Sequence, residues 1–311
     1  MKKTAVAVAM TVLFVGCSSN LTEVKTEDTA LYQSTDWVTD GVFTQGVEGP
    51  AVDKQGRLYA VNFAEQGTIG VLSEANSAKL LVKLPDNSVG NGIRFDRQGN
   101  MYIADYVNHN VLKINAERLT SRSLSTADVK VFAHSPLMNQ PNDIAIATNG
   151  TLYASDPNWA NNTGQLWRID TNGDVVLLEK NMGTTNGVEV SPDNKTLYVN
   201  ESVQRTVWQY DLSVQGDISN KRALIQFSDF GLDGMRTDQA GNVYIARYGK
   251  GVVAVVSPQG ELLREVPLKG QFPTNVAFGG KDGKTIFVTM QKRGAIESFR
   301  NEISGRSFVN P

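Results

Sequence analysis

A strand–turn–strand unit recurs six times in this chain and constrains its fold more than any other feature. Each copy opens on an oxygen-bearing side chain, runs into a short apolar strand, turns at Gly, Asn or Asp, and returns in a strand rich in aromatic and β-branched residues. The opening residues are Glu48, Asn91, Asn142, Asn186, Asp233 and Asn275. Their spacing, roughly 45 residues, fits one four-stranded blade of a β-propeller. We therefore predict an all-β, six-bladed β-propeller with four-stranded antiparallel blades around a central channel.

The six units account for the whole chain after its N-terminal segment, so we predict a single propeller domain over residues 32–311. The returning strands are expected at residues 58–61, 101–104, 152–155, 197–200, 243–246 and 286–289. A ring of sheets must close on itself, and we expect residues 39–43 or 307–309 to supply the closing strand. The longest unit carries an insertion at residues 118–128, which is either a lid or a solvated loop.

The N-terminus reads as a bacterial lipoprotein signal. Two lysines precede a short apolar run, which is too short to span a membrane, and Cys17 follows as the only cysteine. We expect a signal peptide over residues 1–16, lipidation of Cys17 and a tether over residues 17–31; an ordinary signal peptide with an incidental cysteine is the alternative. The predicted location is the cell envelope, on the periplasmic face of the outer membrane. The lipid anchor would be the only membrane contact.

Net charge excludes one class of partner. The chain carries a formal charge of -2 with a pI near 5.8, so it offers no positive field for a phosphate backbone. We expect no nucleic-acid partner, a monomeric chain and a small-molecule ligand.

The six opening residues predict a site at one mouth of the channel. Innermost strands of a propeller run in the same direction, so equivalent residues at their starts form a ring. Two carboxylates and four amides would face one another there, and two unpaired acids need a cation or protons to neutralise them. Oxygen ligands without His or Cys favour Ca²⁺ or Mg²⁺ over Zn²⁺. The alternative is that these residues only form turns, although Glu48 is not a turn former.

These residues also carry a family resemblance. The segments at 48–50, 140–144, 186–193, 232–235 and 273–280 resemble those of the gluconolactonase/regucalcin family of six-bladed propellers and its distant relative diisopropylfluorophosphatase. The resemblance implies one divalent cation in the channel, most simply Ca²⁺ with Mg²⁺, Mn²⁺ or Zn²⁺ as alternatives. The implied ligands are Glu48, Asn142, Asn186 and Asp233, with Asn275 close by.

The resemblance implies a metal-dependent hydrolase that opens a sugar-acid lactone. The cation would polarise the lactone carbonyl and activate water, and Asp233 would accept the proton of that water. Glu48 would be mainly a ligand, although the two roles are exchangeable. Phosphotriesterase-type relatives carry a histidine where this chain has Ala277. We expect His109 and His134 to be structural or solvated.

Further residues are candidates for substrate contacts. Asn91 and Asn275 complete the ring, while Arg94 and Arg236 follow ring positions by three residues, as does Glu189. The arginines either bind substrate or form an internal Arg94–Glu189–Arg236 ion network. Trp159 is expected on a loop above the ring, where it either stacks on a sugar ring or packs.

The sequence is also compatible with three other functions. The chain could be a non-enzymatic envelope propeller that acts as a protein-interaction scaffold. It could be a metal-dependent esterase or phosphotriesterase-like hydrolase. It could also be a relative of strictosidine synthase, which shares the propeller but not this metal chemistry.

Overall fold

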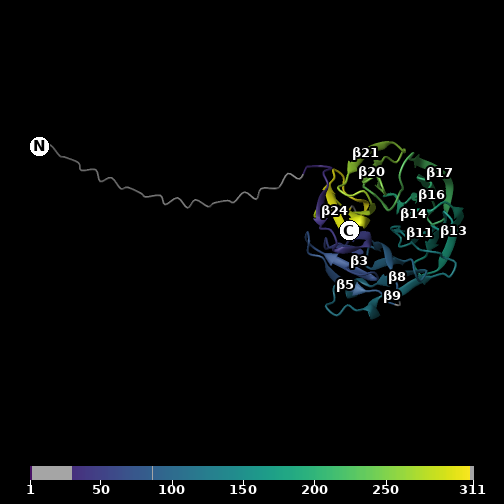
Figure 1. Ribbon diagram of the computed structural model, residues 1–311, viewed down its shortest axis with the longest axis horizontal. Coiled ribbons are helices and arrows are strands. Elements are labelled where there is room, and N and C mark those ends of the chain that lie inside the picture. The colour runs from purple at the N-terminus through teal and green to yellow at the C-terminus, as the bar shows by residue number, and fades with distance from the viewer. Residues whose placement is uncertain (2–29, 86, 309–311) are drawn as a thin grey trace.

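The computed structural model describes residues 1, 30–85 and 87–308, which form six four-stranded antiparallel sheets arranged in a ring (Figure 1). The innermost strands contact one another in chain order around the channel, and the strand of the sixth blade returns to that of the first. This architecture confirms the predicted six-bladed propeller.

The blades follow one another along the chain, each from the innermost strand outward. Blade 1 contains β2 (Phe43–Val52), β3 (Leu58–Phe63), β4 (Thr68–Leu72) and β5 (Lys79–Lys83). Blade 2 contains β6 (Gly90–Phe95), β7 (Met101–Asp105), β8 (Asn110–Ile114) and β9 (Lys130–His134). Blade 3 contains β10 (Ile144–Ile146), β11 (Leu152–Asn158), β12 (Thr163–Ile169) and β13 (Val175–Met182).

The second half of the ring repeats this order. Blade 4 contains β14 (Thr185–Val190), β15 (Thr196–Glu201), β16 (Thr206–Leu212) and β17 (Ile218–Gln226). Blade 5 contains β18 (Met235–Thr237), β19 (Val243–Arg247), β20 (Val252–Val256) and β21 (Leu262–Pro267). Blade 6 contains β22 (Pro273–Gly279), β23 (Thr285–Met290), β24 (Ala295–Arg300) and β1 (Thr35–Val38).

The closing strand corrects one prediction. It is β1, which pairs antiparallel with β24 at Thr35↔Ser298, whereas residues 39–43 do not form it, residues 307 and 308 belong to a 3₁₀ turn, and residue 309 lies outside the described residues. Residues 39–42 instead turn the chain from the sixth blade into β2 of the first. The N-terminal strand therefore fastens the last blade, which joins the two ends of the ring.

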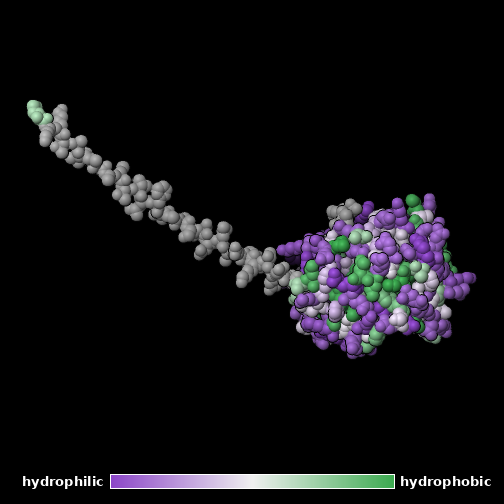
Figure 2. Space-filling model, turned by 90° about the horizontal axis from the view of Figure 1, so that it is seen from above, coloured by the Kyte–Doolittle hydropathy of each residue, from purple (hydrophilic) through white to green (hydrophobic). Residues whose placement is uncertain are grey.

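The core lies between blades rather than in one central mass. Six separate apolar clusters each combine residues of two neighbouring blades, as where Ile69 of blade 1 packs in one cluster with Ile103 of blade 2. The outermost strands bury fewer of their apolar side chains, and some of these, such as Leu80 and Leu262, are exposed. Figure 2 shows the molecule turned by 90° from Figure 1. Its surface there is mostly hydrophilic, with hydrophobic side chains scattered among the hydrophilic ones.

A tyrosine–aspartate pair explains part of the sequence repeat. The second residue of strand β3 is Tyr59, which donates a hydrogen bond to Asp53 in the preceding turn at 2.8 Å. Tyr102 donates to Asp96 and Tyr244 to Asp238 in the same way, at 3.2 and 3.0 Å. Each aspartate also accepts backbone N–H bonds of its turn, so the pair fixes the hairpin between the first two strands.

The insertion of the second blade is not a lid over the predicted ring. It holds the four-residue helix α1 (Ala116–Leu119) and the 3₁₀ turn η1 (Thr126–Asp128), which an Arg118–Asp128 ion pair joins at 2.8 Å. Because it connects the end of β8 opposite Met101 to β9, it lies at the other end of the blade from Asn91. Leu119 is buried between blades 1 and 2, so the insertion has a packing role.

The predicted signal peptide, Cys17 and nearly all of the tether lie outside the described residues. Within the part that the structure describes, helices are restricted to α1 and single 3₁₀ turns, including η2 (Gln291–Arg293) and η3 (Arg306–Phe308). None of the helices in that part is long and apolar enough to cross a membrane.

Candidate active site in the central channel

The ring residues meet at one mouth of the channel. Five of the six line a single cavity of about 400 Å³, namely Glu48, Asn91, Asn142, Asn186 and Asp233. The sixth, Asn275, is fully buried behind Glu48 and donates a hydrogen bond from Nδ2 to Glu48 Oε2 at 3.1 Å. Residues up to 227 positions apart in the sequence are thus brought together by the closure of the propeller.

Glycine after the ring residue allows the inner strands to approach so closely. A side chain at Gly234 would overlap the Asn275 amide, and one at Gly49 would overlap the Asn91 carbonyl. Gly49 also has a φ of +59°, a conformation that favours glycine. Two blades are exceptions: Val276 follows Asn275 in the sixth, and Asp143 follows Asn142 in the third and places a carboxylate at this position.

Three buried oxygen atoms of this ring lack hydrogen-bond partners in the described part of the chain. They are Glu48 Oε1, Asn142 Oδ1 and Asn186 Oδ1, from three different blades. A buried acceptor without a donor is costly, and native proteins leave few of them unless another group satisfies them. Among the described residues no three His, Cys, Asp or Glu side chains cluster as a metal site, so amides must complete any ligand set. Carboxylate and amide oxygens are the donors that Ca²⁺ prefers, so this set fits that ion.

The two carboxylates of the ring are held in environments that disfavour their charge. Burial, together with the negative charge of Asp143, raises the pKa of Glu48 to about 7. Burial and the charge of Glu48 raise the pKa of Asp233 well above its ordinary value, although Asn186 donates to it. A cation between the two acids would remove this penalty.

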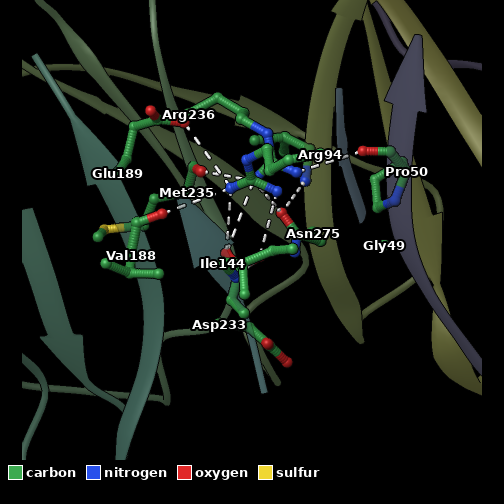
Figure 3. Close-up of polar contacts among 12 residues, drawn as sticks. Gly49, Pro50, Arg94, Ile144, Val188, Glu189, Asp233, Met235, Arg236 and Asn275 are labelled. Carbon is green, nitrogen blue, oxygen red and sulfur yellow. Dashed lines mark hydrogen bonds and ion pairs between the residues drawn. The ribbon is translucent and has the colours of Figure 1, made fainter. Parts of the chain in front are cut away.

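A hydrogen-bond chain that starts at Arg236 orients the Glu48 carboxylate. Arg236 donates from Nη1 to Asn275 Oδ1 at 3.0 Å, and that contact turns Asn275 Nδ2 toward Glu48 Oε2. Glu48 Oε2 also accepts the Gly49 N–H, so Oε1 is the oxygen left free. Figure 3 shows Arg94 and Arg236 side by side above Asn275, while the Asp233 carboxylate points away from them.

Arg94 and Arg236 do not line the ring cavity. They belong to an ion network on the side of the ring that faces the opposite mouth of the channel. Asp143 lies between them, 3.2 Å from Arg94 and 3.6 Å from Arg236. Glu189 lies 3.8 Å from Arg94 and 3.1 Å from Arg306. The predicted alternative of an internal network is therefore the observed arrangement, with Asp143 in place of Glu189 as the partner of Arg236. Burial and the charge of Arg94 lower the pKa of Arg236 to about 10.

The mouth of the cavity is aromatic and amide-rich. Trp159 lines it from the loop between β11 and β12, with 42% of its surface exposed. The pattern did not single out four further lining residues, Tyr106, Gln140, Tyr248 and Gln291. Three of them sit at the ends of second strands or just beyond, a position that recurs in every blade and could have identified them. Neither His109 nor His134 lines the cavity.

Comparison with known proteins places the chain in a family. Residues 46–292 match the SMP-30/gluconolactonase/LRE-like region. The chain belongs to this family. Solved structures with the same fold include the calcium-binding regucalcin of Agrobacterium tumefaciens, with a TM-score of 0.72 at 19% identity over 85% of this chain and 92% of that one. A gluconolactonase of Xanthomonas campestris has a TM-score of 0.71 at 18% identity over 86% and 89%.

Several sequence relatives carry the names of hydrolases. The 6-deoxy-6-sulfogluconolactonase of Pseudomonas putida is 31% identical over 153 residues, 48% of this chain and 53% of that protein. The gluconolactonase of Zymomonas mobilis is 27% identical over 223 residues, 64% of this chain and 60% of that protein. The chain thus spans between half and two thirds of these lactonases. The diisopropyl-fluorophosphatase of Loligo vulgaris is 24% identical over 291 residues, 84% of this chain and 90% of that protein.

Proposed function

We propose that this protein is a metal-dependent hydrolase that opens a lactone, with a sugar-acid lactone as substrate. The observation that carries the proposal is a set of three buried oxygens beside the Asp233 carboxylate that have no hydrogen-bond partner among the described residues, namely Glu48 Oε1, Asn142 Oδ1 and Asn186 Oδ1. The family membership and the lactonase names of its relatives support the reaction class. A scaffold would gain nothing from burying acceptors without donors.

Glu48, Asn142, Asn186 and Asp233 would hold one divalent cation, Ca²⁺ by the chemistry of the donors. Such a cation supplies Lewis-acid polarisation of the carbonyl and lowers the pKa of water. Its charge would balance the two carboxylates.

Asp233 is the proposed general base. Its carboxylate lines the ring cavity beside the three buried oxygens, where it would accept the proton of a water molecule held there. Asn275 ties one oxygen of Glu48, which suits Glu48 to a fixed ligand role. Asp233 instead lines the cavity and is half-buried.

The cavity lining favours a substrate without negative charge. Among the described residues it contains no Lys or Arg, and apart from the carboxylates of Glu48 and Asp233, which a cation would neutralise, its polar side chains are amides and hydroxyls. Trp159 and Tyr248 offer aromatic faces against which a sugar ring stacks. A second candidate is phosphotriester hydrolysis, which the match to diisopropyl-fluorophosphatase over 84% of the chain favours.

A substrate panel tests the proposal. The purified full chain is assayed with glucono-δ-lactone, simple γ- and δ-lactones and a fluorophosphate, with calcium and after chelation. Lactone opening that chelation abolishes and calcium restores is the expected result. Fluorophosphate hydrolysis without lactone opening would favour the second candidate, and no hydrolysis in any arm would favour a scaffold.

We also propose that the chain is a monomer anchored at the periplasmic face of the bacterial outer membrane through lipidated Cys17. The sequence alone supports the anchor. Membrane fractionation of Cys17→Ser tests it: release of the protein from membranes is expected, and unchanged fractionation would contradict lipidation. Light scattering of the released protein measures its oligomeric state.

A further inference from the structure

We propose that the opposite mouth of the channel is a binding site for a small organic dianion, with phosphate or carboxylate groups. A second cavity of about 520 Å³ lies there. It is lined by the ends of the inner strands, the turns that follow them, and Gly305, Arg306 and Ser307 of the C-terminal segment. A cavity of this size accommodates a small metabolite.

Positive charge exceeds negative charge in this cavity. Its charged lining residues are Lys54, Arg94, Arg97, Arg236 and Arg306 against Asp53, Asp96 and Glu189. Five cations against three carboxylates leave an excess of two. Including the nearest paired groups, Arg57 with Asp53 and Asp143 with Arg94, leaves that excess unchanged. A chain whose net charge is -2 thus concentrates positive charge in one concave place.

The carboxylates of the lining are already engaged. Asp53 accepts from Arg57 and Tyr59, and Asp96 accepts from Asn100 and Tyr102. Glu189 accepts the Val190 N–H and pairs with Arg306. None of these three groups is available to neutralise a further arginine.

The cations, in contrast, retain unused donors. The exposed Arg97 side chain has no hydrogen bond or ion pair within the described residues, and the buried Nε of Arg94 has no acceptor there. Arg306 is held beside Glu189 and the Ile146 carbonyl, and burial together with the charges of Arg94 and Arg97 lowers its pKa. Guanidinium groups that repel one another in a partly desolvated cavity gain from a bound anion. Their planar donor pairs match carboxylate and phosphate oxygens.

This site is separate from the ring cavity. The two cavities share no lining residue, and the Arg94–Asp143–Arg236 layer lies between them. The inference therefore does not rest on the proposed hydrolase activity and holds equally for a scaffold.

Calorimetric titration tests the inference. The full chain is freed of divalent ions by chelation, so that the ring site plays no part, and is then dialysed to remove the chelator, which is itself a polycarboxylate. It is titrated with inorganic phosphate and with succinate, and with glucose as the uncharged control. Saturable binding of an anion but not of glucose is expected. Arg97→Gln should weaken it roughly tenfold, because Arg97 is a free donor that no other contact requires. Arg306→Gln should weaken it as well.

Arg222→Gln is the matched control, because Arg222 is an exposed arginine on the outer strand β17, paired with Asp211. Its anion affinity should equal that of the wild type. Absence of saturable binding, or equal loss in Arg222→Gln and Arg97→Gln, would overturn the proposal. Arg97 is exposed and has no hydrogen bond or ion pair within residues 30–85 and 87–308, so unchanged circular dichroism is expected for its variant.

Discussion

The two mouths of the channel are built from the same inner strands but have opposite electrostatic deficits. At the ring mouth, Glu48, Asn142 and Asn186 present buried acceptors that lack donors in the described part of the chain. At the other mouth, Arg94 and Arg97 present donors that lack acceptors among the residues that the structure describes. An acceptor excess favours a cation and a donor excess favours an anion. One propeller can therefore carry two sites for ligands of opposite charge.

Asp143 and Arg236 lie between the two mouths and link them through their contacts. Asp143 neutralises the arginines from the ring side, while Arg236 reaches Glu48 through Asn275. Buried ion pairs often stabilise little in total, because desolvation offsets their attraction. The network is better explained as a device that fixes the orientation of the ring carboxylate. The following predictions test whether the two mouths differ as this comparison requires.

The largest expected effect is the loss of activity in Asp233→Asn. An amide cannot accept the proton of the attacking water, and it also weakens the cation site, so kcat with a lactone that the wild type opens should fall about 10²- to 10⁴-fold. Glu74→Gln, which changes an exposed acid far from the channel, should leave kcat unchanged. Equal kcat values for Asp233→Asn and wild type would remove Asp233 from the reaction.

Calcium affinity should respond to Arg236 although Arg236 lies outside the ring cavity. Arg236→Met removes the donor that orients Asn275, so calorimetric calcium binding should weaken by about 10- to 100-fold, the usual effect of residues that support metal ligands. Arg236→Lys keeps a donor and should recover part of the affinity. Unchanged calcium affinity in Arg236→Met would show that the ring does not depend on the layer below it.

The sequence predicted the ring because each of its residues opens a repeat, and equivalent positions of the repeat occupy equivalent positions in the blades. It did not predict Asp143 as the partner of both arginines, because that contact depends on how neighbouring blades converge. The signal was present, since Asp143 replaces the glycine that follows the ring residue in four of the other five units.

Other features depended on contacts distant in the chain. The four residues 35–38 show no strand pattern of their own, and they become the closing strand only by pairing with β24 about 260 positions later. The cavity-lining Tyr248 and Gln291 lie beyond their second strands, where the local pattern gives way to loops. The closing strand and the positions of these loop residues depend on how the ring closes, so the local sequence pattern does not predict them.

Without a cation, stability should depend on pH through the ring acids. Because the folded state raises the pKa of Glu48 from 4.5 to about 7, it binds the proton more tightly than the unfolded chain does. Stability contributed by the protonated group is complete at pH 4.5 and below, and falls as pH rises toward 7. The melting temperature of the chelated protein should drop by a few degrees between pH 5 and pH 8, and Glu48→Gln should flatten this slope. Saturating calcium should also flatten it, and an equal slope in all three cases would exclude the ring acids as its cause.

The smallest expected effect concerns which mouth the substrate enters. Trp159 lines the ring cavity and is 42% exposed, so Trp159→Ala should fold normally while losing one aromatic face for the substrate. Stacking of this kind contributes about 1 kcal/mol, which corresponds to a roughly fivefold rise in KM with little change in kcat. Val203→Ala removes an exposed apolar side chain from the equivalent loop of blade 4, outside the cavity lining, and should change neither constant. If Trp159→Ala behaves like Val203→Ala whereas Arg97→Gln raises KM, the substrate enters at the basic mouth and the roles assigned to the two ends of the channel are reversed.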